Sequence, residues 1–132
     1  MTYMGGKQKL SKYIVPFINS YIEENNIENF YDIFCGGFNI GCNVNCENIY
    51  ANDLCPTLIA LHKAAQEDFN SICINSSRGQ WDRCYSEYKR IRVNNFENST
   101  IPLAEIGAIE WLGSYSGRGF PGGYGVKSTG RN

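Results

Sequence analysis

The sequence predicts an α/β fold built around a nucleotide-binding strand–helix–strand unit. Segment 31–34 has the length and composition of a buried parallel strand, and segment 48–52 is predicted to be the second strand. The glycine-rich stretch 35–41 follows the first segment directly, and Asp53 follows the second. This acid comes about 20 residues after the glycine turn opens, the interval at which nucleotide-binding folds place a carboxylate on a ribose hydroxyl. The chain is therefore expected to bind an adenosine-containing cofactor.

The elements before the second strand follow from residue spacing. Apolar residues recur at helical intervals over 10–22, and Pro16 inside this pattern predicts a kink or a break. The polar run 23–29 predicts a loop before the first strand. The stretch 39–44, between the strands, predicts a short helix or an irregular crossover.

Helices are predicted to dominate the remainder of the chain. Pro56 suits the first turn of a helix that carries Leu58 and Leu61 on one face. The apolar spacing over 81–91 predicts a second helix, and a third is expected to begin near Pro102. The tail 113–132 holds seven glycines and few aliphatic residues, so its own composition gives no reason for order.

Charge is distributed unevenly along this chain of 132 residues, a length typical of one domain or a piece of one. Residues 1–77 carry four Lys/Arg against eight Asp/Glu, a net charge of −4, and residues 78–132 carry eight against five, a net charge of +3. The basic part is the better surface for a polyanion, although a solvated helix face would produce the same tilt.

Cysteine and histidine usage argues against disulfides and metal. The six cysteines form no CxxC pair, which favours reduced thiols in a cytosol. With His62 as the single histidine, a zinc site is not expected. The first residues lack the apolar region of a signal peptide, and no run approaches the ~18 apolar residues of a membrane span. Neither a metal nor a membrane is predicted as a partner, and the oligomeric state is not indicated.

Two further segments could contact a ligand. In the stretch Tyr3–Lys7, the tyrosine could stack on a ring and the lysine could pair with a carboxylate, although Gly-Gly-Lys also suits a flexible end. The tail 113–124 interleaves aromatic residues, one arginine and glycines, a composition found in nucleic-acid-binding segments and in linkers. Asp53, for its part, could also cap the helix that follows it.

These motifs together resemble a known enzyme family. Tyr3–Lys7, 31–37 and 51–54, in this order, are similar to motifs of the Dam-type DNA adenine methyltransferases, and to the bacteriophage members in particular. The resemblance implies a partial Rossmann-like core that uses S-adenosylmethionine, formed by residues 1–77. It implies that residues 78–132 are the start of a helical target-recognition region for double-stranded DNA, in the cytoplasm of a bacterial host.

The resemblance also implies roles for individual residues. Tyr3 and Lys7 match the family motif that holds the methionine end of the cofactor, and Asp53 matches the acid that holds the ribose hydroxyls. The glycine loop beneath the cofactor is matched by Phe34, Cys35, Gly36 and Gly37. The DNA-facing segment would contain Tyr115, Arg118 and Tyr124.

One family motif is missing from these residues. Methyl transfer in the family needs an Asp-Pro-Pro-Tyr-type motif, which grips the amine of an adenine flipped out of the duplex. The four prolines of this chain are never adjacent, so no catalytic residue is assigned, and the order of motifs would place this one beyond Asn132. The chain is expected to be the N-terminal portion of a site-specific DNA adenine methyltransferase, inactive by itself.

Three alternatives stay open at this stage. The first is a truncated phage remnant that binds only cofactor or DNA. The second is an unrelated Rossmann protein, such as a nicotinamide-dependent oxidoreductase, with similar glycine and acid spacing. The third is a chain that hardly folds alone, because a truncated sheet leaves an unpaired strand edge.

Overall fold

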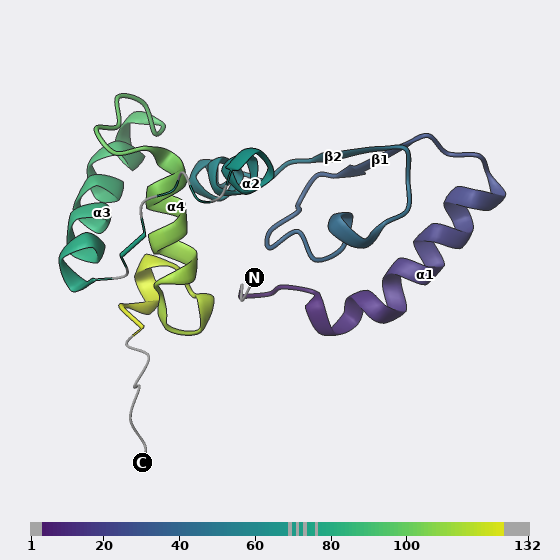
Figure 1. The fold of residues 1–132 in the computed structure, drawn as a ribbon, viewed down its shortest axis with the longest axis horizontal. Coiled ribbons are helices and arrows are strands. Elements are labelled where there is room, and N and C mark those ends of the chain that lie inside the picture. Colours follow the sequence, from purple (N-terminus) through teal and green to yellow (C-terminus); the bar gives the residue numbers. More distant parts are fainter. Residues whose placement is uncertain (1–3, 69, 71, 73, 76, 126–132) are drawn as a thin grey trace, which may run out of the picture. The chain divides into compact units, whose positions relative to one another are not determined.

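The computed structural model describes residues 4–68, 70, 72, 74–75 and 77–125 (Figure 1). The chain divides into two compact units, with the division between Leu54 and Cys55. The first unit contains α1 (Gln8–Glu24), β1 (Asn29–Asp32), the 3-10 turn η1 (Gly41–Asn43) and β2 (Asn48–Ala51). The second contains α2 (Pro56–Asp68), α3 (Arg78–Ile91), η3 (Arg92–Asn94), α4 (Leu103–Leu112), η4 (Tyr115–Gly117) and η5 (Phe120–Gly122). The sequence predicts a functional boundary after residue 77, which differs from this structural division after Leu54 and stays a prediction.

The first unit combines a helix with a small parallel sheet. Strands β1 and β2 pair in parallel, with Asn29 opposite Asn48 and Asp32 opposite Ala51. The glycine loop and η1 connect them, in agreement with the predicted short crossover. Strand β1 begins two residues before the predicted segment and ends at Asp32, because the chain turns at Ile33.

The prediction that the first strand is buried is wrong, and the second strand is exposed as well. Tyr31 on β1 is 62% exposed and Tyr50 on β2 is 49% exposed. Their rings stack on each other, with centroids 4.8 Å apart, so both lie on one face of the sheet. A parallel pair is buried only when layers cover both faces, and no described element of the first unit covers this one.

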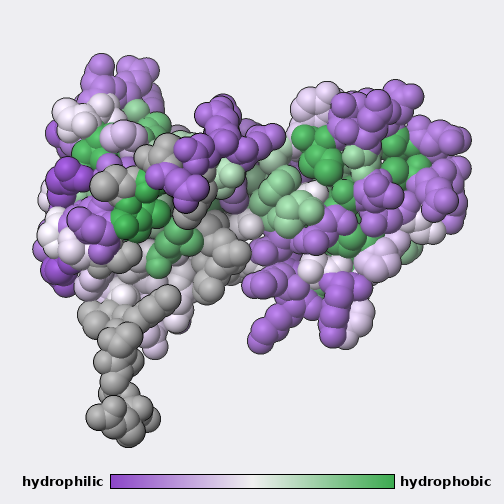
Figure 2. Space-filling model, in the orientation of Figure 1, coloured by the Kyte–Doolittle hydropathy of each residue, from purple (hydrophilic) through white to green (hydrophobic). Residues whose placement is uncertain are grey.

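Helix α1 confirms the predicted amphipathic helix and runs through Pro16 without a break. Val15 and Ile22 are buried, but other apolar side chains of the helix remain open to solvent. Phe17 is 77% exposed and Tyr13 is 68% exposed. Figure 2 shows hydrophobic side chains that reach the surface between hydrophilic ones.

The second unit has a conventional apolar core. Helix α4 is apolar on nearly all sides, and it packs against α2 and α3. A side chain at Gly107 would overlap the carbonyl oxygen of Thr57, so glycine allows α2 and α4 to approach closely. The buried core cluster consists of Trp81, Cys84, Ile91, Ile101, Ile106, Ile109 and Phe120.

The tail is ordered as far as residue 125, which corrects the expectation from its composition. Phe120 is only 3% exposed and packs edge-on against Trp81, with ring centroids 5.0 Å apart. Ser114 and Tyr124 form an antiparallel bridge. Gly119 and Gly123 have φ of +69° and +77°, which glycine adopts readily. One buried aromatic residue and the turns around it therefore order the segment; residues 126–132 lie outside the described part.

Candidate functional site

The glycine loop joins the tips of the two parallel strands. The Cys35 amide donates a hydrogen bond to the Asn52 carbonyl over 2.9 Å, and the Phe38 amide donates to the Cys35 carbonyl over 2.7 Å. Gly36, between them, has a φ of +48°, a left-handed conformation that favours glycine. The loop is thus held by backbone contacts, and its sequence suits the turn that it makes.

Asp53 holds this loop from the end of β2. Its Oδ2 atom accepts a hydrogen bond from the Gly36 amide over 2.9 Å. This contact does not test the alternative role of Asp53 as a cap of the following helix, which stays a prediction. Because a carboxylate can accept about four hydrogen bonds, the contact with Gly36 does not by itself exhaust its acceptor capacity.

A pocket of about 270 Å³ brings the N-terminal Gly-Gly-Lys segment together with this loop. It therefore unites most of the predicted cofactor-binding residues, while Asp53 acts on the lining through Gly36. Tyr3 lies outside the described residues. The pocket is lined by Gly5, Gly6, Lys7, Asp32, Phe34, Cys35, Gly36, Gly37, Asn39 and Ile40.

Within this lining, the Lys7 Nζ atom donates to the Gly5 carbonyl oxygen over 2.7 Å. Phe34 is 83% exposed, whereas Cys35 is buried. The lysine therefore brings a positive charge to the pocket, and the phenylalanine offers an open ring at its edge.

Asp32 is a pocket residue that sequence reasoning missed. Burial raises the pKa of its carboxyl above the ordinary value, and the nearby Asp53 carboxylate raises this pKa further. A hydrogen bond from the Gly41 amide over 3.2 Å opposes both effects. Its position at the carboxyl end of a strand, three residues before Cys35 opens the glycine loop, is the signal that could have found it.

The Cys35 thiol is not an activated nucleophile. Burial raises its pKa to about 11, and the carboxylates of Asp53 and Asp32 add to this effect. A thiol with this pKa carries its proton at neutral pH and is a poor attacking group. Cys35 therefore serves the pocket through its backbone and its packing.

The predicted DNA-facing residues all lie in the second unit, in different settings. Tyr115 is 61% exposed, and Arg118 is exposed as well. Tyr124 instead packs against Trp81, with centroids 5.6 Å apart, and the Arg78 guanidinium lies 5.7 Å from its ring centroid. Tyr115 and Arg118 are available to a partner, whereas Tyr124 also supports the fold of the tail.

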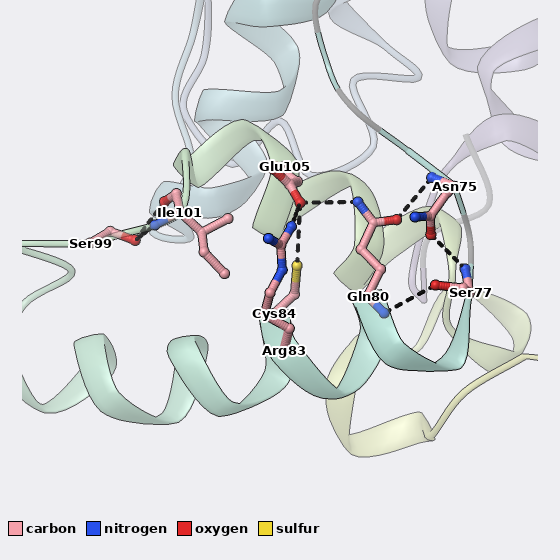
Figure 3. A network of polar contacts seen from close by, with 8 residues as sticks. All are labelled: Asn75, Ser77, Gln80, Arg83, Cys84, Ser99, Ile101 and Glu105. Atoms are coloured by element: carbon pink, nitrogen blue, oxygen red, sulfur yellow. Dashed lines mark hydrogen bonds and ion pairs between the residues drawn. The ribbon is translucent and has the colours of Figure 1, made fainter.

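A buried polar network fixes α3 against α4 (Figure 3). Glu105 of α4 accepts a hydrogen bond from Gln80 Nε2 over 3.0 Å and forms an ion pair with Arg83. Gln80 in turn accepts from the Asn75 amide over 2.9 Å. Burial and the Glu105 carboxylate raise the pKa of the adjacent Cys84 thiol to about 11, and the Arg83 cation opposes this. These groups are satisfied internally, so we assign them to the fold.

The described residues hold neither a metal-binding cluster nor a membrane-spanning helix. In the described part of the chain, no group of three or more His, Cys, Asp or Glu side chains is arranged to hold a metal ion. In the same residues, no helix combines the length and the apolar character needed to cross a membrane.

The chain matches one protein family and two curated relatives. A family model described as D12 class N6 adenine-specific DNA methyltransferase matches residues 3–103. The Type II methyltransferase M.FokI of Planomicrobium okeanokoites is 44% identical over 54 residues, which are 41% of this chain and 8% of that protein. The modification methylase StsI of Streptococcus sanguinis is 41% identical over 54 residues, again 8% of its length. No solved structure matches.

Proposed function

We propose, from the premise that the chain belongs to the D12 class of N6 adenine-specific DNA methyltransferases, that its first unit binds S-adenosylmethionine. The observation that carries this proposal is the pocket that joins Lys7 to the glycine loop. In this proposal, the parallel pair β1–β2 and its connecting loop are part of a Rossmann-like core. The loop lies at the carboxyl ends of the strands, where open α/β sheets bind nucleotides.

The charges of the pocket suit this cofactor. Asp32 and Asp53 repel each other, which contributes to the raised pKa of Asp32. A cationic ligand would relieve this repulsion, and S-adenosylmethionine carries positive charge on its sulfonium and its ammonium group. The residues present therefore fit the cofactor.

We assign the parts of the cofactor to the residues as follows. Lys7 pairs with the cofactor carboxylate, Asp32 accepts from the ammonium group, and Asp53 accepts from the ribose hydroxyls. Gly36 and Gly37 allow close approach of the ligand to the backbone. Tyr3, outside the described residues, keeps its proposed place at the methionine end. When bound, S-adenosylmethionine supplies an activated methyl group.

The reaction that we propose for the whole protein is methyl transfer to the exocyclic amine of adenine in double-stranded DNA. The curated matches cover only 8% of each relative, so this activity is inferred from the family. The exposed Tyr115 and Arg118 suit contacts with the DNA backbone. A protein that acts on bacterial or phage DNA would work in the host cytoplasm.

A second candidate function is binding without turnover. It is favoured by the absence of an Asp-Pro-Pro-Tyr motif from these 132 residues. Incorporation of a labelled methyl group into adenine by the chain alone would exclude this candidate. A bound cofactor without any incorporation would favour it.

Calorimetric titration with S-adenosylmethionine tests the cofactor site. Asp53→Ala should weaken binding by ~1–3 kcal/mol through lost hydrogen bonds to a charged group. Because this substitution also removes the hydrogen bond from the Gly36 amide to Asp53, Asp53→Asn is measured in parallel, since its side-chain oxygen can still accept from that amide. We expect Asp53→Asn to lose affinity as well, because the amide has fewer acceptor sites for a diol than the carboxylate.

The matched control is Glu47→Ala, which removes one exposed acid of the first unit and should leave the affinity unchanged. Wild-type affinity in both Asp53 variants would remove Asp53 from the site. No binding to the wild-type chain would refute the proposed cofactor.

A further inference from the structure

Two cations at the C-terminal end of α3 have no carboxylate partner among the described residues. Lys89 and Arg92 are both exposed. The Lys89 Nζ atom lies 4.6 Å from the ring centroid of Tyr85, and the Arg92 guanidinium lies 6.0 Å from that of Tyr88. The other cations of this helix are neutralised in ion pairs, namely Arg78 with Asp82, Arg83 with Glu105, and Arg90 with Glu87.

The tyrosines beneath these cations connect them to the tail. The ring centroids of Tyr85 and Tyr88 both lie 5.0 Å from that of Phe120. Phe120 begins η5, two residues after Arg118. Lys89 and Arg92 therefore border the same aromatic cluster that anchors the segment carrying Arg118.

The loop that begins three residues after Arg92 has an unusual backbone conformation. Asn95, Phe96 and Asn98, in the loop that follows η3, have φ between +51° and +63°. Such conformations persist only when surrounding contacts enforce them. Arg90 provides one such contact, because its Nη2 atom donates to the Asn98 carbonyl oxygen over 2.7 Å. Glu87 holds this arginine in place: its Oε1 atom accepts from Arg90 Nη2 over 2.7 Å and from the Thr100 amide over 2.6 Å.

We propose that Lys89 and Arg92 contact DNA phosphates and extend the DNA-facing surface from the tail onto the end of α3. This inference rests on the proposed function. Phosphate contacts from Lys and Arg supply affinity and register without reading sequence. A cation without an acidic partner has no ion pair to break when a phosphate arrives, and a side chain laid on a ring has less freedom to lose.

The test is binding of the 132-residue chain to a fluorescein-labelled 20-base-pair duplex of mixed sequence, measured by anisotropy over a range of salt concentrations. We expect the double variant Lys89→Gln/Arg92→Gln to bind about tenfold more weakly at low salt. The slope of log K against log salt should decrease in magnitude by about 2, since two phosphate contacts are lost. The loss should be similar on a second, unrelated duplex.

The matched control is Lys12→Gln/Lys63→Gln, which removes the same charge. Lys12 also lies over a tyrosine, 4.7 Å from the ring centroid of Tyr13, and Lys63 is an exposed residue of the second unit. This control should retain wild-type affinity and slope. A second variant, Lys89→Arg/Arg92→Lys, keeps both charges and should retain most of the binding.

The outcomes separate this inference from the proposed function. If the wild-type chain binds the duplex and the Lys89/Arg92 variant binds equally well, the inference is overturned and the proposed function stands. An equal loss in the charge-conserving variant also overturns it, because the loss would then come from packing. If the wild-type chain binds no duplex at low salt, the inference falls together with the DNA-binding part of the proposed function, while the cofactor titration still tests the rest.

Discussion

Each of the two units of this chain is stabilised internally by a different kind of interaction. In the second unit, Trp81, Ile106 and Ile109 are at most 3% exposed and belong to one apolar cluster. In the first unit, large apolar side chains such as Phe17 and Phe34 remain about four-fifths exposed. Apolar burial is the main stabilising contribution in folding. We therefore expect the second unit to be the more stable of the two.

The first unit is organised by hydrogen bonds at its strand tips. The Gly36 and Gly41 amides donate to the carboxylates of Asp53 and Asp32, and the Asn52 amide donates to the Asp32 carbonyl over 2.9 Å. A hydrogen bond between neutral groups contributes about 0.5–1.5 kcal/mol and one to a carboxylate about 1.5–3 kcal/mol. Full burial of one large apolar side chain contributes about 1.5–3 kcal/mol, and the second unit buries several of them. They position backbone and carboxylates for a ligand. We therefore expect the helical second unit to be stable and the first unit, which carries the candidate ligand pocket, to be only marginally stable.

The largest expected effect comes from Trp81→Ala in the core of the second unit. Trp81 is 3% exposed and packs against Phe120 and Tyr124. Its loss should destabilise the second unit by ~3–5 kcal/mol through lost burial and a cavity. Urea unfolding followed by circular dichroism measures this change, and amide hydrogen exchange should show faster exchange over 113–125.

Val93→Ala is the control, because Val93 is 77% exposed and its truncation should change stability by less than about 0.5 kcal/mol. Equal effects of the two substitutions would contradict the assignment of the core. Faster exchange at Cys35 and Gly36 as well would show that the two units unfold together.

The second prediction concerns Glu110, a carboxyl that is 3% exposed within the second unit. Burial raises its pKa from 4.5 to about 7, although the hydroxyl of Thr57, which donates to its Oε2 atom over 2.7 Å, opposes the shift. In the folded state the carboxyl keeps its proton up to about pH 7, whereas in the unfolded chain it ionises near pH 4.5. Stability should therefore fall as pH rises through this window, by about 3 kcal/mol in total.

Glu110→Gln should abolish this dependence, because its amide stays neutral and can still accept from Thr57. Urea unfolding should show the variant about 3 kcal/mol more stable than wild type at pH 8 and nearly equal at pH 4.5. Glu87 does not interfere in this range. The hydrogen bonds from Arg90 and the Thr100 amide hold its pKa below the ordinary value, so its contribution is lost only as pH falls below about 4.5. Parallel pH profiles for variant and wild type would contradict the prediction.

Local sequence patterns predicted the elements better than their environments. Helical spacing correctly located α1 and the helices of the second unit, and two short segments with a glycine turn indicated β1 and β2. Periodicity reports which residues could face a core, and it does not report whether a covering layer is present. The sequence pattern therefore could not show that Tyr31 and Tyr50 would be exposed. Composition also failed for the tail, where a single buried residue, Phe120, orders a glycine-rich segment.

The candidate site was partly predictable for similar reasons. Lys7 and the loop 34–37 were found as motifs, and the structure places them around one pocket. Asp32 was missed because the predicted strand ran over 31–34, which placed this acid inside the strand. The structure ends β1 at Asp32, and so places the carboxylate at the strand tip. The carboxylate and ring partners of the α3 cations could not be foreseen, since residues far apart in sequence, such as Arg83 and Glu105, meet only in the fold.

Bound cofactor should slow amide exchange in the first unit and leave exchange in the second unit unchanged. S-adenosylmethionine at a concentration one hundred times its dissociation constant should stabilise the state that binds it by about 2.7 kcal/mol. If the first unit is the binding unit and opens independently, amide exchange should slow at Cys35, Gly36 and Gly41. Amides of the second-unit core, such as those of Ile106 and Ile109, should exchange at unchanged rates, because ligand linkage acts only on openings that release the ligand. Equal protection of both sets would show that the units open as one cooperative body. Protection confined to the second unit would place the cofactor outside the glycine-loop pocket and refute its assignment.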